Sequence, residues 1–332
     1  MMDYEIFKAV EQGKFLSYLP EEYKDAEVKI HPAKKVNRTL DALSVIKDDS
    51  RVFPSMYVDE MYEKYQACGN LEIVLQAAAW KYAQTADREK GRELEMDLGQ
   101  FKDNVIMCLV NTEQNRELLE DVPNRAFQDL SVIYQWVIDS APNAIDSIIV
   151  SNKLAEIAGM TEEQLFQCAV HNTRRISPVS ITSVSDVLGR PLEGVDIPQE
   201  IREEMERACH VAENMWIIGN SRGVHGAVSM LYEENLHRLA EKIGDDLIIL
   251  PSSIHEVIAI PAAMERGGMA NLAEEVRSIN MGELELEERL SNSVYHYDRT
   301  ARKVTLAAES PEKRLDGKQA ELPLIQEDKR QR

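Results

Sequence analysis

Residues 215–280 repeat one pattern, in which two apolar runs joined by a polar turn are followed by an amphipathic helix. The first copy consists of MWIIGNSRGVHGAVSMLY and the helix EENLHRLAEKIG, and the second of DLIILPSSIHEVIAI and the helix MANLAEEVRSIN. Apolar runs joined by short polar turns predict β-hairpins, and hairpins that alternate with helices favour a mostly antiparallel sheet. The expected fold is therefore α+β, with helices packed on one side of the sheet and a hairpin-helix unit repeated in the C-terminal half.

The residues before this repeat predict further strands and helices. NVIMCLV is an unbroken apolar run that suits a buried strand, and FQDLSVIYQWVID and AIDSIIVSN are expected to pair across a turn. A helix over 56–68 is expected to stop at Gly69, and Thr161 with Gln164 forms the capping-box pattern of another helix. The chain has no G-x-G-x-x-G or Walker sequence, which disfavours a nucleotide-binding core.

A stretch rich in glycine, proline and small polar residues suggests a division of the chain near residue 190. The chain has 332 residues, enough for two domains of ordinary size. We expect an N-terminal α+β region over 1–190 and a C-terminal hairpin-helix region over 191–308, although the two could form one continuous domain. Charged and polar residues dominate 309–332, so a mobile tail is expected there.

The charge of the chain excludes more functions than it identifies. The net charge is −20, from 58 acidic and 38 basic residues. Such a surface repels phosphate backbones and disfavours direct binding of nucleic acid, while an acidic mimic of DNA stays open as an alternative. No apolar run approaches the roughly 18 residues needed to cross a bilayer, and the first residues lack the apolar core of a secretory signal. We therefore expect a cytoplasmic protein without membrane contact.

Cysteine and histidine spacing predicts no metal and no cofactor. The four cysteines include no C-x-x-C pair and are expected to be reduced and mostly buried. The seven histidines include no H-x-x-x-H or H-E-x-x-H pattern.

The segment ILPSSIHEVIAIP contains the residue types of a hydrolase triad, in Ser252, Ser253, His255 and Glu256. On an extended strand Ser253 and His255 would stand roughly 6.6 Å apart at Cα, and known triads take their members from separate segments. Ser253 and Glu256 also fit S-x-x-E, which satisfies backbone N–H groups at the start of a turn. A structural turn is the favoured interpretation, and a binding surface or hydrolysis stays open.

A second candidate is GNSRGVHG over 219–226, which contains Arg222 and His225. Glycine-rich backbone can bend into an anion-binding nest, and an arginine can hold a phosphate or carboxylate with two hydrogen bonds. A plain hairpin loop is the simpler interpretation. If both hairpins belong to one sheet, the two loops can meet at one end. The predicted binding residues are then Arg222, His225, Ser252, Ser253, His255 and Glu256, and no catalytic residue is predicted.

Several stretches together resemble a bacterial family of unknown function, family 5688. They are VFPSMYVDEMYEKYQACG, DVPNRAFQDLSVIYQWVID, LFQCAVHNT, MWIIGN with GAVSMLY, and ILPSSIHEVIAIP, spread over about residues 50–298. The resemblance implies one recurring architecture and an intracellular bacterial setting, and it implies no reaction, cofactor or site residue.

These observations favour a non-enzymatic accessory protein that binds another macromolecule, with an unknown protein as its partner. The first alternative is a small-molecule hydrolase that uses the loops at 219–226 and 252–256. The second alternative is the acidic DNA-mimic inhibitor.

Overall fold

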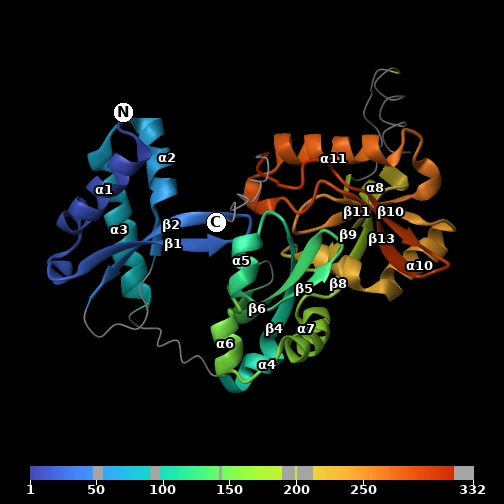
Figure 1. Ribbon diagram of the computed structural model, residues 1–332, viewed down its shortest axis with the longest axis horizontal. Helices are drawn as coiled ribbons and strands as arrows, with labels where there is room; N and C mark the ends of the chain where they lie inside the picture. Colours follow the sequence, from blue (N-terminus) through green and yellow to red (C-terminus); the bar gives the residue numbers. More distant parts are fainter. Residues whose placement is uncertain (48–54, 90–97, 142–143, 189–198, 200–211, 318–332) are drawn as a thin grey trace, which may run out of the picture. The chain divides into compact units, whose positions relative to one another are not determined.

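The computed structural model describes residues 1–47, 55–89, 98–141, 144–188, 199 and 212–317. The chain forms two compact units, Met1–Asp97 and Leu98–Arg332, each with its own hydrophobic core (Figure 1). This division differs from the expected boundary near residue 190, which itself lies outside the described residues. The reason is strand pairing, because β8 (Val179–Ser183) and β9 (Trp216–Asn220) stand on either side of 190 and are neighbours in one sheet.

Unit 1 packs three helices on one face of a three-stranded antiparallel sheet. Val28, Leu43 and Val45 point from the strands into the core beneath the helices. The elements are α1 (Tyr4–Lys14), η1 (Phe15–Tyr18), η2 (Glu21–Tyr23), β1 (Glu27–Lys35), β2 (Arg38–Ile46), β3 (Ser55–Tyr57), α2 (Val58–Cys68) and α3 (Leu71–Glu89), with β2 in the centre of the sheet.

The join between α2 and α3 follows the expected capping residues. Gly69 ends α2 in the left-handed conformation, with φ of 70°, where a side chain would be strained. The side-chain oxygen of Asn70 then accepts the N–H of Ile73 at 3.2 Å and caps α3.

Unit 2 begins with a small antiparallel sheet built around one long strand. The strands are β4 (Val105–Asn111), β5 (Asn124–Phe127), β6 (Leu130–Ala141) and β7 (Ala144–Ile149), and the helices are α4 (Phe101–Asn104), α5 (Arg116–Asp121), α6 (Asn152–Ile157) and α7 (Glu162–Ile176), after η3 (Leu98–Gln100). β6 pairs with β4 along one edge and with β5 and β7 along the other. Every residue of β4 is buried, and α7 starts with the predicted capping box.

The second sheet of unit 2 has six strands in the order β13-β12-β10-β11-β9-β8, and all neighbours are antiparallel. The remaining elements of this part are α8 (Val184–Leu188), η4 (Gly226–Leu231), α10 (Glu233–Ile243), β10 (Leu247–Pro251), β11 (Val257–Pro261), η5 (Ala262–Met264), α11 (Met269–Glu283), η6 (Leu286–Glu288), β12 (Val294–Asp298) and β13 (Lys303–Ala308). The fold is α+β, as the sequence predicts.

Helices cover both faces of this six-stranded sheet, whereas we expected them on one side. Ile249 of β10 faces a core that includes Leu236 of α10. Its neighbour Ile248 faces the other way, where it packs with Ala273 and Val276 of α11. Successive residues of a strand point to opposite faces of the sheet. Because β10 has apolar side chains at both odd and even positions, each face of the sheet needs a helix packed against it.

The first of the two expected hairpins does not form. β9 lies between β11 and β8 in the sheet, so both of its edges are already paired. The residues expected to pair back onto it, Gly226–Leu231, instead coil into η4 and are almost all buried. The second hairpin, β10 with β11, forms as predicted.

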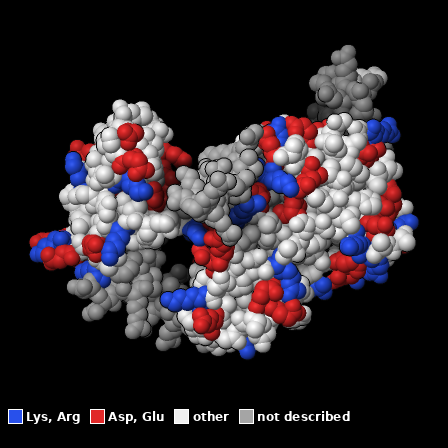
Figure 2. Space-filling model, in the orientation of Figure 1, with Lys and Arg blue, Asp and Glu red and all other residues white. Residues whose placement is uncertain are grey.

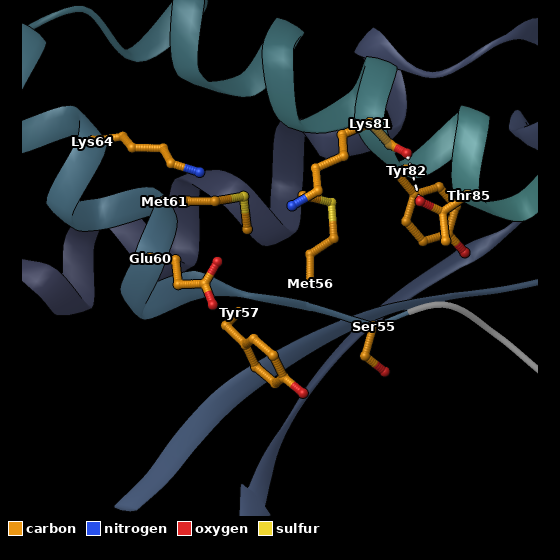
Figure 3. A pocket seen from close by; sticks show the side chains of 9 residues that line it. All are labelled: Ser55, Met56, Tyr57, Glu60, Met61, Lys64, Lys81, Tyr82 and Thr85. Carbon is orange, nitrogen blue, oxygen red and sulfur yellow. Dashed lines mark hydrogen bonds between the residues drawn. The ribbon is translucent and has the colours of Figure 1, made fainter. Parts of the chain in front are cut away.

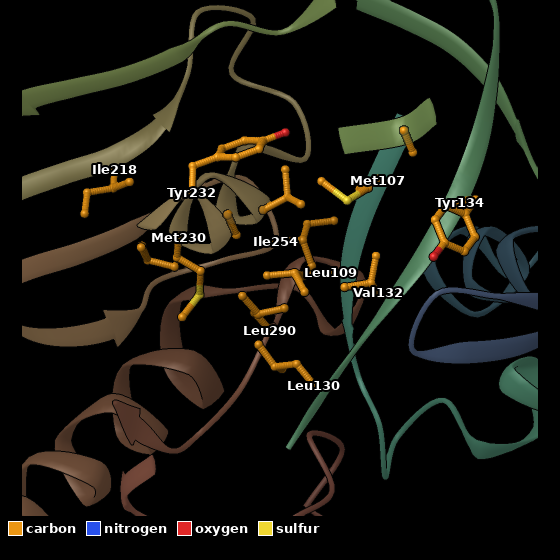
Figure 4. Close-up of a cluster of buried hydrophobic side chains, with 14 of the residues drawn as sticks. Met107, Leu109, Leu130, Val132, Tyr134, Ile218, Met230, Tyr232, Ile254 and Leu290 are labelled. Atoms are coloured by element: carbon orange, nitrogen blue, oxygen red, sulfur yellow. The ribbon is translucent and has the colours of Figure 1, made fainter. Parts of the chain in front are cut away.

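One core joins the two sheets of unit 2 (Figure 4). Leu109 and Val132 reach it from the small sheet, Ile218 from the large one, and Met230 from η4. Ile254, in the loop between β10 and β11, also points into this core and is 8% exposed. The loop that carries the candidate serines is therefore anchored by an apolar side chain.

Part of the expected tail packs against unit 2. Leu315 is fully buried, its N–H donates to Gln114 at 3.1 Å, and its carbonyl accepts from Arg289 at 2.8 Å. Mobility of the tail stays a prediction, and within 309–317 Leu315 occupies a buried position against unit 2. Residues 318–332 lie outside the described residues.

Two simple observations concern the whole described chain. Within 1–47, 55–89, 98–141, 144–188 and 212–317, no helix combines the length and hydropathy of a membrane span. Cys68, Cys108 and Cys168 are free thiols, and Cys108 is buried.

Unit 1 buries a carboxyl group without a partner. Glu11 on α1 is fully buried, and neither of its side-chain oxygens has a hydrogen-bond partner among the residues that the structure describes. Burial raises the pKa of Glu11 to about 8. The folded state thus favours the neutral acid, because an unpaired buried charge is costly.

We predict that Glu11→Gln stabilises unit 1 at alkaline pH. The unfolded chain releases the Glu11 proton near pH 4.3, whereas the folded chain holds it up to about pH 8, so wild-type stability falls as pH rises through this window. The variant should gain up to about 5 kcal/mol at pH 8 and much less at pH 4. Urea unfolding at pH 4, 6 and 8 measures this, with Glu63→Gln on the exposed side of α2 as control. Equal pH dependence in wild type and Glu11→Gln would contradict the prediction.

Candidate functional site

The two candidate loops meet at one end of the six-stranded sheet. β9 and β11 are antiparallel neighbours. The chain that follows Asn220 and the chain that precedes Val257 therefore lie at the same end of the two strands. The backbone N–H of His225 donates to Nδ1 of His255 at 3.2 Å, and the two rings lie 6.0 Å apart at a tilt of 40°. The sequence predicted this meeting of the loops, although only one of them belongs to a hairpin.

Ser253 holds the backbone of its own loop. Its side-chain oxygen accepts the N–H of His255 at 3.0 Å, and its N–H donates to the carbonyl of Glu256 at 3.0 Å. The expected S-x-x-E cap would have joined Ser253 to the N–H of Glu256, so the observed turn is tighter by one residue. Ser253 is 7% exposed, and its hydroxyl bonds a peptide group and not an imidazole. This geometry is that of a turn and not of an activated nucleophile.

His225 is held uncharged at neutral pH. Burial, and then the neighbouring His255, lower the pKa of His225 to about 4. Its backbone is left-handed, with φ of 51°. A neutral imidazole offers no charge to a phosphate or carboxylate, so His225 does not supply the cation that an anion site would need.

Gly226 explains the glycine-rich character of the first loop without a ligand. A Cβ at this position would lie 2.4 Å from the carbonyl oxygen of His255 and 2.7 Å from the backbone nitrogen of Asn220. Only glycine allows the two backbones to approach so closely. The glycine therefore serves the packing of the two loops.

Arg222 contacts the end of α7. Its Nε donates to the carbonyl of Ile176, the last residue of α7, at 2.8 Å. Its backbone N–H donates to the side chain of Asn220 at 3.0 Å. A cation at a helix C-terminus is favoured by the helix dipole, which gives Arg222 a structural role.

The six predicted residues lie in two loops at one end of the sheet, and their contacts differ. His225 and His255 touch, Ser253 supports the backbone, Arg222 is directed to α7, and Ser252 and Glu256 are partly exposed. Their role in binding a ligand stays a prediction. In the described part of the chain, no group of three His, Cys, Asp or Glu side chains is placed to hold a metal ion.

Asp129 lines a polar pocket of about 220 Å³ in unit 2, and its carboxylate has a structural role there. Asp129, in the turn before β6, accepts hydrogen bonds from Tyr295 and Ser291, each at 2.6 Å. Burial, and then the charge of Asp129, raise the pKa of Tyr295 well above its usual value. Asp129 therefore ties the small sheet to β12.

Unit 1 contains a pocket that the sequence did not predict. The pocket has a volume of about 230 Å³ and lies between β3, α2 and α3 (Figure 3). Its lining includes Met56, Tyr57, Glu60, Met61, Lys64 and Lys81.

The exposed side of α3 carries two large apolar side chains. Trp80 is 66% exposed and Ile73 is 57% exposed. They stand two helical turns apart, with the exposed Ala77 between them, so the three share one side of the helix. We refer to Ile73, Ala77 and Trp80 as the α3 stripe. The buried positions of α3, such as Leu75 and Tyr82, follow one helical repeat. In the sequence, the signal of the stripe is that its apolar residues do not belong to that repeat.

We predict that Ser253→Ala destabilises unit 2 by about 0.5–2 kcal/mol, the usual loss when a side chain that caps backbone is removed. The lost bond is the one from the N–H of His255. Chemical denaturation measures the change, and Ser252→Ala, a partly exposed neighbour, should leave stability almost unchanged. A wild-type midpoint for Ser253→Ala would show that this hydroxyl does not hold the loop.

We predict that acid destabilises unit 2 through His225. Its pKa is about 4 when folded and about 6.5 when unfolded, so its stabilising contribution is complete above pH 6.5 and is lost as pH falls toward 4. The loss is up to about 3 kcal/mol. His225→Asn, which tolerates a left-handed backbone, should flatten the pH dependence of melting between pH 7 and 4. His171→Gln on the exposed side of α7 should not, and an unflattened profile for His225→Asn would refute the prediction.

Comparison with known proteins gives one result, which covers both units. No curated protein and no solved structure matches the chain. A family model with the description "Family of unknown function (DUF5688)" matches residues 4–299 and so covers most of the 332 residues. The resemblance inferred from the sequence is confirmed, and the chain belongs to this family of unknown function, DUF5688.

Proposed function

We propose that this chain is a non-enzymatic binding protein of the bacterial cytoplasm, and that it docks a protein partner on the α3 stripe of unit 1. The observation that carries the proposal is the exposure of Trp80 (66%) in line with Ile73 (57%). Large apolar side chains that share one helix face mark interaction surfaces, and tryptophan is among the residues most enriched where binding energy concentrates.

The corner at 219–226 and 252–256 adds support, because three of its polar side chains already bond backbone groups. Ser253 and Arg222 bond backbone groups of their own unit, and Nδ1 of His255 accepts a backbone N–H. The hydrolase alternative has less support for this reason, since a serine nucleophile needs a base within hydrogen-bond reach.

The DNA-mimic alternative also has less support. On the face shown in Figure 2, Asp and Glu side chains are interspersed with Lys and Arg. A mimic of duplex DNA would present carboxylates in two long rows, like the phosphates that it replaces.

We predict that Ile73→Ser combined with Trp80→Ser weakens partner binding at least about tenfold. Burying side chains of this size contributes about 1.5–3 kcal/mol each, and about 1.4 kcal/mol corresponds to a factor of ten. Both side chains are exposed, so the variant should keep the melting temperature of the wild type.

The test is affinity capture from the host bacterium with wild type, the double variant and a control, followed by titration of the purified partner. The control is Ile157→Ser with Val187→Ser, two exposed apolar residues of unit 2. A protein retained by wild type and control, and bound at least about tenfold more weakly by the double variant in titration, is the expected result. Equal affinity for all three proteins would refute the docking surface.

A further inference from the structure

Two lysines extend into the pocket of unit 1 from different helices. Lys64 comes from α2 and Lys81 from α3, and their ammonium groups reach toward the same space (Figure 3). Neither forms an ion pair with a carboxylate among the residues that the structure describes. A third lysine, Lys35, lies over Tyr57, a lining residue of the pocket, with its Nζ 5.3 Å from the ring centre.

The charge at the pocket is opposite in sign to that of the chain as a whole. The sequence has 58 acidic and 38 basic residues, and elsewhere in unit 1 Lys8 and Lys29 pair with acids at 2.6 and 3.1 Å. The acidic side chain in the lining of the pocket is Glu60 of α2. Two lysines from two helices around one carboxylate leave a local excess of positive charge, which favours an anion there.

The rest of the pocket is apolar and adaptable. Met61 lies between the two lysines in Figure 3, and Met56 lines the same pocket. Methionine side chains adjust to the shape of a bound group, and a volume of about 230 Å³ suits one side chain better than an extended ligand. An acidic side chain fits this lining, because its carboxylate can meet the lysines while its methylene groups contact the methionines.

The pocket opens next to the α3 stripe. Lys81 follows Trp80 directly, and it stands four positions after Ala77, which places Ala77 and Lys81 on the same side of α3. A segment that lies on the stripe can therefore place its next side chain beside Lys81.

We infer that the partner presents an acidic, apolar segment, with its apolar side chains on the α3 stripe and an Asp or Glu side chain between Lys64 and Lys81. This inference rests on the proposed function, since it names the chemistry of the partner that the stripe binds. The pocket fixes the position of the segment along α3, and the stripe supplies most of the contact area.

Selection from a displayed library of random linear peptides on the full chain tests the inference without knowledge of the natural partner. Peptides retained by wild type should carry Asp or Glu next to aromatic or aliphatic residues. Lys64→Glu with Lys81→Glu should bind these peptides at least about tenfold more weakly and should select Lys or Arg in their place. Lys24→Glu with Lys29→Glu makes the same charge change at two exposed positions outside the pocket and should bind as wild type does.

The outcomes separate this inference from the proposed function. Peptides without an acidic preference, or peptides that the Lys64/Lys81 variant binds as tightly as wild type, would overturn the inference alone if they still require Ile73 and Trp80. Peptides that bind the Ile73/Trp80 variant as well as wild type would overturn the docking surface itself. A selection that enriches no peptide would overturn both.

Discussion

The contact between Gly226 and the carbonyl of His255 is the constraint on which the arrangement of unit 2 depends. Because no Cβ intervenes, the chain leaving β9 can turn against the loop between β10 and β11 and enter the core as η4. From the other side of the same contact, Ile254 enters that core as well. Two loops rich in polar residues thus bring two apolar segments together, and the polar side chains satisfy the backbone that the turn exposes.

The α+β class and most elements follow from apolar runs and capping residues in the sequence, as β4, β6 and α7 illustrate. The expected hairpin of β9 with Gly226–Leu231 does not form, and the reason cannot be found in the local sequence. Whether Gly226–Leu231 can pair back onto β9 depends on β8 and β11, which occupy both edges of β9. The position of α11 is a similar case, because an amphipathic helix identifies its apolar side but not the sheet face that receives it.

The candidate site, like the fold, was predictable only in part. Strand order brings His225 and His255 together, and the sequence pattern anticipated that meeting. The direction of each polar group was not predictable, because Arg222 and Ser253 are fixed by backbone acceptors and donors that no spacing rule identifies. The exposure of Trp80 was not predictable, because helical periodicity identifies the buried face of α3 and does not distinguish the apolar residues outside it.

The bond between Asp129 and Tyr295 has a consequence for the order in which the chain matures during translation. The two residues are 166 positions apart, which the ribosome covers in roughly 10–30 s at about 5–20 residues per second. During that interval the small sheet exists without the strands that complete its core. Unit 1 closes its sheet within residues 27–57 and faces no such delay. The nascent chain therefore carries all three strands of the unit 1 sheet ahead of an apolar sheet that still lacks its cover, and exposed apolar surface of this kind favours aggregation.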